Sequence, residues 1–182
     1  MKQNLSSKLE DYGELLIQKH VKVHNQLSTL LWYPPPCGTF KLNVDGTIFS
    51  SLNASGVGAV LRDNNGCMVM AMSKRELGIH KVEDIEVLAA LRGLQLISHI
   101  GISHLIIEGD SLAAMEAICS RGEDLNRCSV LIHEVKKVLS SFISFEVLHV
   151  GRHGNEVAHL LARQTRFVDD TLQWWNEPPD FI

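Results

Sequence analysis

Three carboxylates occur at positions where the surrounding pattern does not favour one. Asp45 ends an alternating strand-like run, Glu86 lies on the small apolar stripe of a helical segment, and Asp110 follows a short apolar run. Hard divalent cations are bound by oxygen ligands from several carboxylates. Two such ions about 4 Å apart activate water and stabilise the leaving oxygen in phosphodiester cleavage. The three residues are therefore candidate metal ligands at a site of phosphodiester hydrolysis.

Each carboxylate taken alone also has an ordinary structural interpretation. Asp45-Gly46 is equally compatible with the type I′ turn of a hairpin, because both residues tolerate positive φ. A glutamate at the edge of a helical stripe can be solvated, which would account for Glu86. Asp110 is also suited to the start of the following helix. The order and context of all three residues favour a joint role more strongly than any one of them does.

The elements that must position these residues can be predicted from hydrophobic periodicity. The tetrapeptide 63-DNNG-66 predicts a hairpin, and Ser111 and Asn155 are expected to be helix N-caps. The resulting order β-β-β-α-β-α-α-β-α predicts an α/β (α+β mixed) fold, in which a meander is followed by βαβ crossovers. Strands are predicted over 39–49, 56–62, 67–74, 102–110 and 142–150, and helices over 82–100, 111–120, 126–140 and 155–167.

Both ends of the chain differ from this central region. Apolar residues at three- and four-residue steps predict an amphipathic helix over 5–30, and Pro34-Pro35-Pro36 favours an extended spacer after it. The last residues carry four acidic side chains and no Lys or Arg. We therefore expect three parts: 1–36, an N-terminal helix and Pro-rich linker; 37–168, the folded domain; and 169–182, an acidic tail.

Composition limits the class of protein. Of the 182 residues, 45% are apolar, which is enough to build a core, and no run is long enough to cross a bilayer. The absence of a secretory segment and of a C-x-x-C pair indicates an intracellular chain, cytoplasmic or nuclear, with free thiols. With 17 basic and 21 acidic side chains the net charge is −4, which argues mildly against a simple nucleic-acid binder.

Six segments together resemble the type 1 ribonuclease H family, and more narrowly its plant, retroelement-derived, reverse-transcriptase-like group. They occur in the family's order and extend from Trp32 to the C-terminus, so the resemblance covers most of the chain. The segments are 32-WYPPPCGTFKLNVDGT-47, 56-GVGAVLRDNNG-66, 85-IEVLAALRGL-94, 105-LIIEGDSLAAMEAI-118, 148-LHVGRHGNEVAHLLAR-163 and 174-WWNEPPDFI-182.

This resemblance implies a ribonuclease H-like fold, with a five-stranded mixed sheet flanked by helices. It implies that the first strand continues through Asp45-Gly46 and that the hairpin comes near 50–55. Asp45, Glu86 and Asp110 would bind two Mg²⁺ or Mn²⁺ ions, which cleave the RNA strand of an RNA–DNA hybrid. Contacts to 2′-hydroxyl groups would distinguish RNA from DNA.

One position departs from the family pattern. The fourth acidic ligand usually lies on the last helix, where this chain has His159 in 155-NEVAHLLA-162. Imidazole is a poor ligand for Mg²⁺ and a better one for Mn²⁺, so His159 predicts a weaker second ion, a shifted ion preference or a loss of activity. An ordinary helix residue without a metal role is the alternative for His159.

The resemblance also suggests roles for residues around the carboxylates. His153 would assist proton or product release, although a solvated loop histidine is the alternative. Arg152 is suited to phosphate, and it is as easily a plain surface arginine. The residues expected to contact nucleic acid are Asn43, Gly46, Arg152 and Asn155.

Two other classes of function remain open. His159, the acidic balance and the lack of a basic protrusion over 121–137 favour a domesticated, catalytically silent module that binds nucleic acid or protein. The intact Asp45, Glu86 and Asp110 favour an enzyme. A transposase or a 3′–5′ exonuclease on the same fold is disfavoured by the short chain. The predicted N-terminal helix offers a surface for a protein partner through residues 5–31, and no membrane partner is expected.

Overall fold

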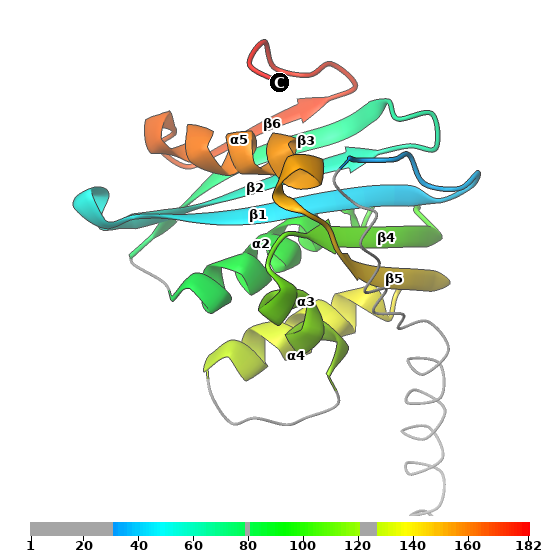
Figure 1. Ribbon diagram of the computed structural model, residues 1–182, viewed down its shortest axis with the longest axis horizontal. Helices are drawn as coiled ribbons and strands as arrows, with labels where there is room; N and C mark the ends of the chain where they lie inside the picture. The colour runs from blue at the N-terminus through cyan, green and yellow to red at the C-terminus, as the bar shows by residue number, and fades with distance from the viewer. Residues whose placement is uncertain (1–30, 79–80, 121–126) are drawn as a thin grey trace, which may run out of the picture.

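The computed structural model describes residues 31–78, 81–120 and 127–182 (Figure 1). The helix predicted over 5–30, and with it the surface for a protein partner, lies outside the described residues. No helix among the described residues is long and apolar enough to span a bilayer. The described cysteines Cys37, Cys67 and Cys119 are free thiols, as the sequence predicts.

Within the described residues, the strands form one mixed sheet in the order β5-β4-β1-β2-β3-β6. β1 pairs in parallel with β4 and β4 with β5, whereas the pairs β1–β2, β2–β3 and β3–β6 are antiparallel. The strands are β1 (Phe40–Phe49), β2 (Ala54–Arg62), β3 (Met68–Leu77), β4 (His104–Gly109), β5 (Ser144–His149) and β6 (Thr171–Trp175).

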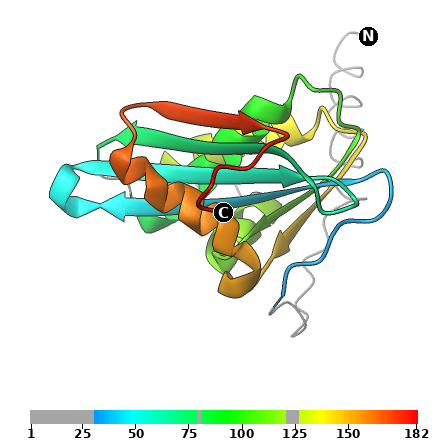
Figure 2. The ribbon, with the colours of Figure 1, turned by 90° about the horizontal axis from the view of Figure 1, so that it is seen from above.

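Helices cover both faces of this sheet (Figures 1 and 2). Three of them lie on one face, and α5 lies on the other, where it crosses β2 and β1. The helices are α2 (Val82–Ile97), α3 (Leu112–Cys119), α4 (Arg127–Leu139) and α5 (Glu156–Gln164), with 3₁₀ turns η1 (Ser50–Leu52), η2 (Arg152–Asn155) and η3 (Thr165–Phe167).

The first strand runs through Asp45-Gly46, so the hairpin-turn interpretation of this dipeptide is wrong. Asp45 pairs with Gly58 of β2, and the chain reverses only after Phe49, through η1. Alternation along β1 places Leu42 and Val44 in the main core against α2, and both are fully buried. The alternate residues Lys41, Asn43 and Asp45 face the other side of the sheet, which carries α5.

The number of strands is six rather than the expected five. β6 lies in the segment predicted to be an acidic tail, and it pairs with β3 from Met70 to Lys74. Trp174 packs against the small core beneath α5 and meets Phe181 edge to face, with ring centroids 5.9 Å apart. A strand of five residues at a sheet edge, among charged and polar neighbours, leaves little periodicity for the sequence to reveal.

Candidate metal centre

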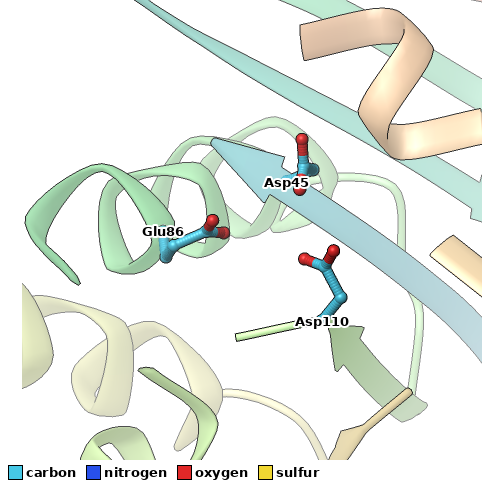
Figure 3. A group of neighbouring side chains, drawn as sticks. All are labelled: Asp45, Glu86 and Asp110. Carbon is cyan, nitrogen blue, oxygen red and sulfur yellow. The ribbon is translucent and has the colours of Figure 1, made fainter. Parts of the chain in front are cut away.

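Asp45, Glu86 and Asp110 converge where β4 ends beside β1 (Figure 3). The parallel pairing ends at Val44 and Gly109, and β1 continues beyond it alongside β2. Asp110 is the first residue after β4, so it lies in the gap that opens between the two strands. Taking one oxygen from each carboxylate, all three atoms lie within 4.8 Å of one another.

Gly46 allows α2 to bring Glu86 into this gap. A Cβ atom at Gly46 would lie 2.9 Å from the carbonyl carbon and oxygen of Ile85, closer than side chains pack against backbone. The backbone N–H of Gly46 donates to Oε2 of Glu86 at 3.2 Å. Gly46, which the sequence suggested as a nucleic-acid contact, is half-buried, and its N–H is engaged by the site itself.

His159 reaches the cluster from α5, on the opposite face of the sheet from α2. Its Nδ1 lies 3.0 Å from Oδ2 of Asp45, and its Nε2 lies 3.1 Å from Nη2 of Arg152. Arg152 Nη1 also lies 3.9 Å from Oδ2 of Asp110. The group of ligand atoms within 4.8 Å of one another consists of the three carboxylates and does not include His159.

The contact to Arg152 fixes the tautomer of His159. A guanidinium has only donors, so Nε2 of the ring must accept, and the ring proton is then on Nδ1 and donates to Asp45. Burial, followed by the charges of Arg152 and Arg163, lowers the pKa of His159. The contact between His159 and Asp45 is therefore a hydrogen bond to a neutral imidazole rather than an ion pair.

Burial and neighbouring carboxylates raise the pKa values of Asp45 and Glu86. Burial raises the pKa of Asp45 to about 9, and the charges of Glu86 and Asp110 and a hydrogen bond to Asp110 act in the same direction. Burial and the charge of Asp110 raise the pKa of Glu86 to about 7, against the hydrogen bond from Gly46. Arg152 opposes both shifts. The cluster therefore holds protons that a bound cation would displace.

A divalent cation fits this donor set. Three carboxylate oxygens from three parts of the chain, lying within 4.8 Å of one another, are suited to a hard divalent cation. A second ion would need further ligands, and the resemblance would take them from His159. Both ring nitrogens of His159 are already engaged, one by Asp45 and the other by Arg152.

Asn43 and Asn155 are placed differently from the expectation that they contact nucleic acid. Each is 1% exposed, and both amides are hydrogen-bonded within the protein. Asn155 Nδ2 donates to the carbonyl of Val44 at 2.9 Å, and Asn43 Nδ2 donates to Asn155 and to Glu108. Asn155 precedes α5 as expected, but its side chain does not cap the helix. The two asparagines instead fasten the start of α5 to β1 beside the site.

The network around Asn43 includes residues that the sequence analysis missed. Trp32 Nε1 donates to Asn43 at 2.9 Å, and its ring lies beneath the cations of Lys41 and Arg62. Lys41 pairs with the buried Glu108 at 2.7 Å. The signal for this pair was present, since Lys41 lies on the same side of β1 as Asp45 and Glu108 interrupts an apolar run.

Two further histidines lie nearby. His149, at the end of β5, lies with Nε2 3.2 Å from the carbonyl oxygen of Asp110, a contact that the sequence analysis did not foresee. His153 is exposed on η2, one residue after Arg152. Ser111, predicted to be an N-cap, is confirmed as one, since its side chain accepts from the backbone N–H of Ala114.

The stability of the metal-free protein should fall as pH rises from about 4 to about 9. Asp45 and Glu86 have ordinary pKa values of 3.8 and 4.5 when unfolded, and the fold raises them to about 9 and about 7. Between these limits the folded state binds more protons than the unfolded state, so the free energy of unfolding falls as pH rises. The loss of stability is absent below the pKa values of the unfolded state and complete above those of the folded state. Thermal unfolding in a chelator should show a lower midpoint at pH 8 than at pH 5.

Divalent cations should offset the loss of stability at high pH, because a bound cation replaces the protons of Asp45 and Glu86. Adding Mn²⁺ should raise the midpoint more at pH 8 than at pH 5. The matched control is Glu86→Gln, for which the fall between the two pH values should be smaller. An equal effect of Mn²⁺ at both pH values would contradict the raised pKa values of the cluster.

A family model described as reverse transcriptase-like matches residues 43–165. RNase H1 from the archaeon Halobacterium salinarum is similar with a TM-score of 0.64 and 20% identity, over 71% of this chain and 98% of that one. The N-terminal RNase H domain of a Mycobacterium tuberculosis protein is similar with a TM-score of 0.62 and 19% identity, over 69% of this chain and 91% of that one.

LC11-RNase H1, isolated from compost, was solved in complex with an RNA/DNA hybrid. That structure is similar with a TM-score of 0.59 and 16% identity, over 69% of this chain and 94% of the other. At these identities the likeness establishes a ribonuclease H-like fold. The search of curated proteins gave no match.

Proposed function

Because this chain belongs to the reverse transcriptase-like family, we propose that it is a metal-dependent endonuclease that hydrolyses the RNA strand of RNA–DNA hybrids. The observation that carries the proposal is the convergence of Asp45, Glu86 and Asp110, from three separate elements, within 4.8 Å. The RNA/DNA hybrid bound by the structurally similar LC11-RNase H1 supports the choice of substrate.

Asp45, Glu86 and Asp110 would hold the divalent cation, with Mg²⁺ or Mn²⁺ as the candidates. When bound, such ions supply activation of a water molecule and stabilisation of the leaving oxygen. Hydrolysis breaks one P–O bond of the RNA backbone, adds the oxygen of water to phosphorus and leaves a proton on the departing oxygen. The resemblance implies two ions held at these carboxylates, and the three oxygens within 4.8 Å of one another support a site for at least one of them.

The protein's own residues hold this geometry. Gly46 fixes Glu86 through its N–H, and His159 orients Asp45 through Nδ1. Arg152 presents its guanidinium beside Asp110, where it is suited to contact the phosphate. His153, exposed in the same turn, is proposed to contact solvent or leaving product rather than the carboxylates.

The test is cleavage of an end-labelled RNA–DNA hybrid, in Mg²⁺ and separately in Mn²⁺. We expect cleavage of the RNA strand in at least one ion and its loss in a chelator, because the carboxylates alone repel a phosphodiester. Double-stranded RNA and double-stranded DNA of the same sequence are the matched controls. Faster cleavage of either control than of the hybrid would contradict the proposed substrate.

A second candidate function is a catalytically silent module that binds nucleic acid. The contact of His159 with both Asp45 and Arg152 favours it, because it engages groups that would otherwise be free for metal or substrate. Retained hybrid binding without cleavage in either ion would decide for this second function.

A further inference from the structure

We infer that the carboxylate cluster takes a single divalent cation and that the guanidinium of Arg152 is the second positive charge of the site. The inference deepens the proposed function and rests on it for the role of that charge in cleavage. It is carried by three observations. The group of ligand atoms consists of the three carboxylates, His159 is engaged by Asp45 and Arg152, and the guanidinium of Arg152 lies next to Asp110.

Each carboxylate of the cluster has one oxygen engaged by the protein. Glu86 Oε2 accepts from the backbone N–H of Gly46, and Asp45 Oδ2 accepts from His159. Asp110 Oδ2 faces Arg152. One oxygen from each of the three carboxylates lies within 4.8 Å of the other two, and these three oxygens form one side of a single hard-cation site whose other ligands are water or phosphate.

His159 cannot serve as a further ligand in this arrangement. A metal ligand must offer a lone pair, and the only lone pair of this neutral ring is on Nε2, which accepts from Arg152 at 3.1 Å. The other nitrogen carries the proton donated to Asp45. The last helix therefore contributes an acceptor for an arginine where it would otherwise contribute a ligand for a metal.

Arg152 is held at the edge of the cluster and open to solvent. Its two terminal nitrogens are directed at Asp110 and His159, and its side chain is 68% exposed. A guanidinium carries five donors in a fixed plane that matches phosphate, so a phosphate can be bound while the contact to His159 persists. A cation at this place stabilises the negative charge that develops on the phosphoryl and leaving oxygens.

Titration with MnCl₂, followed by calorimetry and by the electron paramagnetic resonance of free Mn²⁺, tests the ion count without cleavage. We expect one ion per wild-type chain. Arg152→Ala should keep that count and tighten binding by about 3- to 10-fold, because a cation next to Asp110 is removed. Arg166→Ala, which removes an exposed charge after α5, should change the affinity by less than about twofold.

His159→Asp is the decisive variant for the ion count. A carboxylate in place of the imidazole releases Arg152 and adds an oxygen ligand, so we expect the count to rise to two. Two ions of similar affinity in the wild type would overturn the inference. It would also be overturned if Arg152→Ala left Mn²⁺ affinity unchanged, or if His159→Asp still bound one ion.

Cleavage of the hybrid tests whether the positive charge of Arg152 contributes to catalysis. Arg152→Ala should lower kcat by roughly 10²-fold, with KM changed by less than threefold, and added guanidinium chloride at millimolar concentration should restore part of the loss. In the His159→Asp background, Arg152→Ala should cost less than tenfold, because a second ion then supplies the charge. An unchanged kcat in Arg152→Ala, or a loss confined to KM, would overturn this role.

The two sets of measurements separate the two proposals. A wild-type protein that never cleaves hybrid would refute the proposed function, while the Mn²⁺ titrations would still decide whether the site holds one ion beside Arg152. A wild-type protein that cleaves hybrid with two bound ions would support the function and refute the inference.

Discussion

Asp45→Asn should abolish hybrid cleavage and at the same time make the metal-free protein more stable. Asp45 is 2% exposed and shares its site with two other carboxylates, so the isosteric amide removes a ligand and also a buried repulsion. We expect kcat to fall by roughly 10⁴-fold, the scale on which removal of a reacting group acts. In a chelator at pH 8, the midpoint of thermal unfolding should rise by several degrees.

Two carboxylates provide matched controls for this pair of effects. Asp169→Asn makes the same change at an exposed position and should alter neither cleavage nor stability. Glu108→Gln makes it at a buried carboxylate whose neighbour is the cation of Lys41, 2.7 Å away, and should lower stability. If Asp45→Asn were destabilising like Glu108→Gln, the buried charge of Asp45 would not be repelled by Glu86 and Asp110 in the metal-free protein.

Gly58→Ala should be among the most destabilising single substitutions in the domain. Gly58 lies opposite Asp45 in the β1–β2 pairing, and a Cβ atom there would overlap the backbone of Ala158 and Ala162 in α5. Backbone cannot move aside as a side chain can, so α5 must shift away from the sheet. We expect a loss of about 3 kcal/mol or more in the free energy of unfolding, measured by urea denaturation.

The same displacement should disturb the metal centre, because His159 follows Ala158 on α5 and touches Asp45. Gly101→Ala is the control: its φ of +78° strains any side chain, but nothing lies within 4 Å of the new Cβ atom. It should cost about 1 kcal/mol, with no effect on Mn²⁺ affinity. A Gly58→Ala variant no less stable than Gly101→Ala would show that α5 is not held against the sheet by this close approach.

The course of β1 could be predicted from the resemblance to ribonuclease H but not from its own residues, which also allowed a hairpin turn at Asp45-Gly46. Thr47, Ile48 and Phe49 favour a strand in either case, since they could continue β1 or form the second strand of a hairpin. The three ligand candidates could likewise be found as carboxylates in apolar surroundings. Their convergence depends on the register of β1 against β4 and on the approach of α2 at Gly46, which are long-range properties.

The asparagines show where sequence reasoning fails for physical reasons. A polar side chain is exposed by default, and only partners distant in sequence show that Asn43 and Asn155 are buried. Asn155 is 112 residues away from Asn43, with which it shares a hydrogen bond. The contact between Arg152 and His159 was hidden in another way: the two residues are close in sequence, but only the turn η2 brings the guanidinium back over α5.

β6 covers the edge of the sheet at β3 and limits where the chain can be truncated. The family match ends at residue 165, whereas the strand that covers β3 lies at Thr171–Trp175. A chain cut at the end of the match would bare the backbone donors and acceptors of β3 between Met70 and Lys74. An uncovered strand of that kind is a template for other chains, so such a truncation should produce oligomers and precipitate rather than a smaller monomer. The final residues thus protect the fold from self-association.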